Sequence, residues 1–193
     1  ENIFPLSKDL ETLVVAGKGA DNLGMQCGGW SIDWQGGQGD ITIGTTILDG
    51  IKKTVSESTE IIYSKDGSDV VPNLDNIAVV VIGEDPYTEF FGDKENLDLS
   101  DDDINLISDL KDKGFKVAVL LISGRPLNIA DHIGQWNGFA AIWLPGTEGD
   151  GVSDVLFGDF SSTGRLSFPW PINTEEGSNA DKDNMLFEIG YGL

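Results

Sequence analysis

The chain has 193 residues, of which 39% are hydrophobic, so it can bury one full core but is too short for two ordinary domains. Its 33 acidic and 12 basic residues give a formal net charge of −21, which excludes a nucleic-acid-binding surface because it repels phosphate backbones. No apolar run reaches the roughly 20 residues of a membrane helix, and the start Glu1-Asn2-Ile3-Phe4-Pro5 does not resemble a signal peptide. We expect one domain over residues 1–193 without a membrane contact, and any export signal upstream of it.

Apolar segments that alternate with helical patterns predict the fold. Five segments have the length and composition of strands: Thr12–Ala16, Glu60–Tyr63, Asn76–Ile82, Phe115–Ile122 and Phe139–Leu144. Between them, Thr45–Val55 and Ile104–Leu110 carry apolar residues at helical spacing, and Gly114 marks the end of the second helix. Continuous Val and Ile runs suit a parallel sheet covered on both faces. The pattern predicts an α/β fold with an open, doubly wound, mainly parallel sheet of about five to six strands and helices on both faces.

Two further segments have simpler interpretations. From Gly164 to Leu193 the pattern weakens, and we expect a surface tail that ends in the apolar groups Met185–Phe187 and Gly190–Leu193. The run Asp101–Asp103 is expected at a helix start, where carboxylates suit the helix dipole, as part of a solvated surface. The acid excess as a whole fits an extracellular or periplasmic location.

Several functional classes lack their sequence signature. Cys27 is the only cysteine and His132 the only histidine, so no internal disulfide and no zinc site are expected. A dinucleotide fingerprint fails because its third glycine position is Asn22. Ser123 lacks the flanking glycines of a hydrolase nucleophile elbow. The sequence therefore predicts no cofactor and no metal.

The segments that follow the predicted strands contain the candidate site. They are rich in glycine, acids and aromatic residues: Gly17–Trp30, Gly83–Glu89, Ser123–Pro126 and Pro145–Gly149. Ligands of open α/β sheets bind outside the carboxyl ends of the strands. Aromatic faces stack on sugar rings, and a carboxylic acid can protonate a glycosidic oxygen. On composition alone, sugar chemistry is one option among several.

Five motifs in fixed order resemble one known family. They are Ala20–Trp30 with Trp34–Gly36 and Gly44–Leu48, Gly83–Glu89, Ile122–Pro126, Trp143–Gly149 and Leu156–Asp159. In order and spacing they closely resemble the C-terminal sandwich domain of glycoside hydrolase family three, of the β-glucosidase and exo-β-glucanase type. The resemblance runs from about residue 12 to Leu193.

The resemblance implies an activity and two site residues. It implies a retaining mechanism on a β-linked gluco-oligosaccharide or β-glucan, with Glu84 as the acid/base and Trp30 in the clamp on the aglycone side. The nucleophile is then an aspartate on a separate N-terminal (β/α)₈ barrel domain that these 193 residues do not contain. We expect the active site in the cleft between the two domains.

Departures from the family pattern and two alternatives remain. Ser167 stands where the family's tail motif has proline, and Asp85 with Phe90-Phe91 suggests a different cleft rim and linkage preference. One alternative is a glucan-binding module without catalysis. The other is an α/β domain in which Glu84 is a hydrated loop acid and Trp30 a packed residue.

Overall fold

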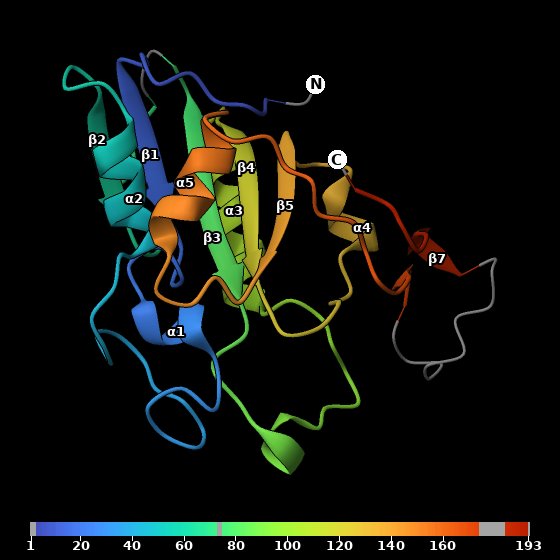
Figure 1. Cartoon of the computed structure of the whole chain (residues 1–193). Helices are drawn as coiled ribbons and strands as arrows, with labels where there is room; N and C mark the ends of the chain where they lie inside the picture. The colour runs from blue at the N-terminus through green and yellow to red at the C-terminus, as the bar shows by residue number, and fades with distance from the viewer. Residues whose placement is uncertain (1–2, 73–74, 174–183, 193) are drawn as a thin grey trace.

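The computed structural model describes residues 3–72, 75–173 and 184–192, so Glu1, Asn2 and Leu193, named above, lie outside it. A five-stranded parallel sheet has the order β2-β1-β3-β4-β5 (Figure 1). Its strands are β1 Thr12–Ala16, β2 Glu60–Ser64, β3 Ile77–Gly83, β4 Lys116–Ile122 and β5 Gly138–Trp143. These elements confirm the five predicted strands and the parallel sheet.

Five α-helices and one 3₁₀ helix connect the described strands. They are α1 Leu23–Cys27, α2 Ile47–Thr54, α3 Asp101–Asp112, α4 Ala130–Ile133, α5 Gly149–Leu156 and the 3₁₀ helix η1 Glu89–Gly92. The predicted helices correspond to α2 and α3. Helix α3 begins with the run Asp101–Asp103, as expected, and Ser100 caps it, its hydroxyl accepting from the Asp103 N–H at 3.2 Å. The sequence did not predict α1 or α5.

Side chains alternate between two apolar layers, one on each face of the sheet. Val14 and Val80 pack with Leu110 of α3 on one face. Val15 and Val79 pack with residues of α2 and α5 on the other, for example Ile47. Figure 1 shows α2 and α5 in front of the sheet and α3 behind it. The fold is therefore the expected α/β sandwich, with the strands β3 and β4 buried on both faces.

The C-terminal tail takes part in the core. Its strands β6 Trp170–Pro171 and β7 Met185–Phe187 form a separate antiparallel pair. The Trp170 side chain is 1% exposed, and its Nε1 donates to the carbonyl oxygen of Leu127 at 2.9 Å. The expectation of a surface tail is wrong for Trp170, because this ring fills the apolar layer on the α3 face.

The carboxyl ends of the strands share one edge of the sheet. The long segments that leave β1 and β3 gather there, at the lower edge in Figure 1. The chain first adds β2 on one side of β1 and then adds β3 on the other side. The order in which strands are added across the sheet therefore reverses beside β1. This is the position at which open α/β sheets bind ligands.

Candidate functional site

Glu84 is fixed directly at the end of β3. Its N–H donates to the carbonyl oxygen of Ile122 on β4 at 3.0 Å. The preceding Gly83 has a φ of 142°, and a Cβ there would collide with the Ile122 carbonyl group. Only glycine allows this approach of the two strands. The backbone therefore sets where the Glu84 side chain leaves the sheet.

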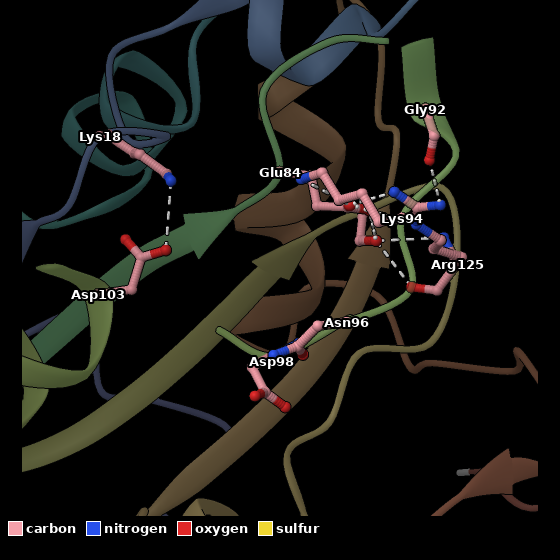
Figure 2. Close-up of polar contacts among 9 residues, drawn as sticks. Lys18, Glu84, Gly92, Lys94, Asn96, Asp98, Asp103 and Arg125 are labelled. Carbon is pink, nitrogen blue, oxygen red and sulfur yellow. Dashed lines mark hydrogen bonds and ion pairs between the residues drawn. The ribbon is translucent and has the colours of Figure 1, made fainter. Parts of the chain in front are cut away.

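Side-chain hydrogen-bond donors surround the Glu84 carboxylate (Figure 2). Arg125 Nη2 donates to Oε1 at 2.7 Å, and its Nε lies 3.2 Å from both carboxylate oxygens. The Ser123 hydroxyl donates to Oε2 at 2.8 Å, and Lys94 Nζ lies 3.8 Å from Oε1. Because the side chain is only 8% exposed, protein donors replace most of its water.

Arg125 and Tyr87 complete this ion-pair network. The guanidinium of Arg125 lies 4.4 Å from the ring centroid of Tyr87. Burial opposes its charge, but the hydrogen bonds and the charge of Glu84 raise the pKa of Arg125 above its ordinary value. Burial and the nearby Glu84 charge raise the pKa of Tyr87 to about 12. At neutral pH, Tyr87 is therefore a neutral phenol.

A second acid, Glu89, lies on the same segment at the start of η1. It has a φ of 47°, a left-handed conformation that costs a non-glycine residue about 1–2 kcal/mol. Its side chain is exposed, and within the described part of the chain its carboxylate has no hydrogen-bond or ion-pair partner. Glu84 and Glu89 therefore differ in kind: one is enclosed by donors and the other faces solvent.

Four exposed aromatic residues surround this segment, and we call them the exposed aromatic cluster: Trp30, Trp34, Phe90 and Phe91. Trp34 lies 6.5 Å from Trp30, 6.2 Å from Phe90 and 5.8 Å from Phe91, measured between ring centroids. Trp30 is 69% exposed, so it does not plug the loop onto the sandwich. Sequence reasoning did not single out Trp34 or Glu89, although Trp34 follows Trp30 in the same glycine-rich segment and Glu89 ends the Gly83–Glu89 motif.

Close packing joins the segments that follow β1 and β3. A Cβ at Gly29 would collide with the carbonyl oxygen of Tyr87 and with the side chain of Thr88. Thr88 N–H also donates to Gln35 Oε1 at 3.3 Å. Trp30 is therefore held beside the segment that begins with Glu84, and the structure brings the two predicted site residues to one edge of the sheet.

Asp103 forms a second buried ion pair at this edge. Its carboxylate lies 3.3 Å from Lys18 Nζ, as Figure 2 shows, and its side chain is 5% exposed. Burial raises the pKa of Asp103 despite the opposing charge of Lys18. The expectation of a solvated acid run is wrong for this residue, because the helical turn points it toward the sheet and leaves Asp101 and Asp102 exposed.

The remaining candidate residues bring no further chemistry. Burial raises the pKa of the Cys27 thiol, which disfavours the reactive thiolate. Within residues 3–72, 75–173 and 184–192, no three His, Cys, Asp or Glu side chains lie close enough to bind a metal ion. No helix among them is long and apolar enough to cross a bilayer.

Comparison with known proteins identifies relatives over the whole chain. Residues 1–193 match the family described as "Glycosyl hydrolase family 3 C-terminal domain". The chain is 29% identical to a lysosomal beta glucosidase of Dictyostelium discoideum, over 100% of this chain and 27% of that protein. It is 25% identical to a periplasmic beta-glucosidase of Salmonella typhimurium, over 98% of this chain and 32% of that protein.

Solved structures show the same fold. An exo-1,3/1,4-beta-glucanase from a Pseudoalteromonas species is 37% identical, with a TM-score of 0.86 over 99% of this chain and 26% of that one. A beta-glucosidase from Listeria innocua has a TM-score of 0.77 at 19% identity, which supports the fold alone. The chain thus spans about a third or less of the length of these relatives.

Proposed function

The chain belongs to the glycosyl hydrolase family 3 C-terminal domains, and we propose that it forms one wall of the sugar cleft of a retaining β-glucoside hydrolase. The rest of the proposed enzyme includes the (β/α)₈ barrel domain that carries the nucleophile. The named relatives are beta-glucosidases, an exo-1,3/1,4-beta-glucanase and a beta-xylosidase. We therefore propose a β-linked gluco-oligosaccharide or β-glucan as substrate, and a location outside the cytoplasm, as in the periplasmic and lysosomal relatives.

One observation supports this function most directly: carboxylates and exposed aromatic rings lie together at the ligand-binding edge of the sheet. Trp30 and Trp34 present apolar faces on which a sugar can stack. A retaining reaction needs two carboxyl groups about 5 Å apart, one as nucleophile and one as acid/base. This domain supplies the acid/base in our proposal, so the isolated domain is expected to fold and not to hydrolyse.

The acid/base predicted from the resemblance is Glu84, and that assignment stays a prediction. We propose it here on the position of the side chain, because Glu84 leaves the end of β3 at the edge of the sheet that carries the exposed aromatic cluster. Arg125 and Ser123 hold its carboxyl group, which fixes the direction in which that group points.

Glutamine variants of the complete enzyme test this assignment. We expect Glu84→Gln to lose about 10²–10⁴-fold in hydrolysis of unactivated β-glucosides, the usual contribution of general acid catalysis. It should still form the glycosyl-enzyme from a dinitrophenyl β-glucoside, whose leaving group needs no proton, and azide should then yield β-glucosyl azide. Glu89→Gln, at the exposed acid of the same segment, should lose less and form no glucosyl azide, since Glu84 is intact.

The other outcomes are equally informative. The azide product from Glu89→Gln alone would establish Glu89 as the donor and overturn the assignment to Glu84. Asp85→Asn, at the exposed residue between them, is the matched control and should retain activity. Normal hydrolysis by both glutamine variants would contradict a catalytic role for this chain and would favour the glucan-binding module.

A further inference from the structure

We propose that Trp34, Phe90 and Phe91 form a second aromatic platform, which binds one sugar unit beyond the unit that stacks on Trp30. This inference rests on the proposed function and concerns the length of the substrate. It assigns a role to the phenylalanine pair, at which the sequence departs from the family pattern. With this platform, a substrate of three units gains a contact that a disaccharide lacks.

Trp34 connects the two ends of the exposed aromatic cluster. Its ring centroid lies 6.5 Å from that of Trp30 on one side. On the other side it lies 6.2 Å from the centroid of Phe90 and 5.8 Å from that of Phe91. The rings therefore form a continuous row that leads from Trp30 through Trp34 to the phenylalanine pair.

The second aromatic platform faces solvent although its rings are large and apolar. The exposed fractions are 41% for Trp34, 62% for Phe90 and 59% for Phe91. The two phenylalanine rings contact each other, with their centroids 4.4 Å apart. Because apolar surface in water costs free energy, a contiguous exposed patch of this kind usually marks a binding site. The three rings are therefore available to a ligand at the edge of the sheet that carries Glu84.

The backbone fixes the phenylalanine pair before any ligand binds. Both residues lie in η1, which ends at Gly92. A Cβ at Gly92 would collide with the Tyr87 ring, and the Gly92 carbonyl oxygen accepts from Arg125 Nη1 at 2.6 Å. Because this turn is already held in place, binding a sugar orders little additional chain, and the entropic cost of binding stays small.

Trp34 is held against this turn by a separate set of contacts. Its N–H donates to Asp33 Oδ1 at 2.7 Å, and its carbonyl oxygen accepts from the Trp30 N–H at 3.1 Å. The next residue, Gln35, accepts from the N–H of Thr88, which directly precedes η1, at 3.3 Å. The two segments therefore present their rings together as one surface.

The polar groups beside the rings fit a neutral sugar. Asp33 and Glu89 directly precede Trp34 and Phe90 in the chain, and both acids are exposed. Sugar hydroxyls can donate to these carboxylates while the apolar face of the sugar stacks on the aromatic rings. An anionic ligand is disfavoured because the formal net charge of the chain is −21. Since the row of rings continues from Trp30, the occupant is a further glucose unit of the same oligosaccharide.

The test is the double variant Phe90→Ala/Phe91→Ala in the complete enzyme, assayed on an aryl β-glucoside and on a β-linked glucose disaccharide and trisaccharide. The wild type should have a higher kcat/KM on the trisaccharide than on the disaccharide. The double variant should lose about 2- to 10-fold on the trisaccharide, the size of an aromatic contact, through KM and not kcat. The other two substrates should change little. Phe160→Ala is the matched control, because Phe160 is also 62% exposed but lies outside both segments.

Further variants separate sugar binding from a role in packing. Phe90→Tyr/Phe91→Tyr keeps both rings and should retain the preference for the trisaccharide. If the alanine variant does not fold, Trp34→Ala tests the same platform and should also reduce this preference. A wild type without the preference, or an alanine variant that keeps it, would overturn the proposal. An equal loss on all three substrates would overturn it too, because the rings would then support the rest of the enzyme. If the complete wild-type enzyme does not hydrolyse the aryl β-glucoside, the proposed function itself fails.

Discussion

Two aromatic clusters in this domain have similar composition and opposite surroundings. The packed aromatic cluster lies beside β5 and consists of the buried Trp170 with the partly buried Trp136, Phe139, Trp143 and Phe187, with neighbouring ring centroids 5.4 to 6.3 Å apart. The exposed aromatic cluster has similar ring spacings at the edge where the strands end. A contiguous exposed apolar surface usually marks a binding site. The position of an aromatic residue in the fold, and not its type, therefore decides whether it packs in the core or can bind a ligand.

Replacing Trp170, the centre of the packed aromatic cluster, should have the largest effect. Trp170→Ala is expected to cost about 3–5 kcal/mol of unfolding free energy, because it leaves a cavity and an unpaired Leu127 carbonyl oxygen. Urea denaturation of the isolated domain measures this loss. Trp34→Ala, at a half-exposed ring, should cost less than about 1 kcal/mol. Similar losses in the two variants would show that the exposed cluster is part of the core.

The opposite contrast is expected for function at Trp30. Trp30→Ala should change the unfolding free energy by no more than about 0.5 kcal/mol, because the side chain is largely exposed. In the complete enzyme it should raise KM for oligosaccharides more than for an aryl β-glucoside, since stacking on the aglycone side is lost. Unchanged kinetics in a folded Trp30→Ala enzyme would remove this residue from the sugar site.

The same contrast between burial and exposure predicts a smaller effect at Asp103. Burial raises the pKa of Asp103 in the folded state above its value in the unfolded chain. Ionisation is therefore less favourable in the folded state, and the free energy of unfolding falls as the pH rises from the unfolded-state pKa through the folded-state pKa. Asp103→Asn should therefore be more stable than the wild type at pH 7, and this gain should disappear in acid. Melting temperatures across this pH range test the sign. Asp102→Asn is the exposed control. A loss of stability at pH 7 in Asp103→Asn alone would mean that the ion pair with Lys18 stabilises the fold by more than the burial of the Asp103 charge destabilises it.

The sheet was predictable because its signal is local. Continuous apolar runs such as Ile77–Ile82 identify a buried parallel strand without reference to the rest of the chain. Helix α1 has no such signal: it is short, and its buried Gln26 accepts from the Ile47 N–H and donates to the carbonyl oxygens of Thr45 and Gly146. These contacts join distant segments, so no local pattern reports them.

The site was predictable in place but not in geometry. The order of the motifs predicted Glu84 and Trp30 as site residues, and both lie at the edge of the sheet formed by the carboxyl ends of the strands. The Glu84–Arg125 pair joins residues 41 positions apart, and the sequence does not show that both carboxylate oxygens are occupied. Equally, the exposure of Glu89 depends on how the chain turns after Tyr87.

The strand order also bears on how the domain folds. β3, β4 and β5 are neighbours both in the chain and in the sheet, so their pairing closes comparatively short loops. β1 instead pairs with β3 through Val14 and Ala78, with α2 and β2 in the intervening chain. Because closing that longer loop costs more entropy, we expect a transition state built around β3, β4 and α3, to which β1 and β2 are added later. In that order the loops after β3 and β4, which carry Glu84 and Arg125, form early, whereas the segment carrying Trp30 and Trp34 is completed only when β1 joins the sheet.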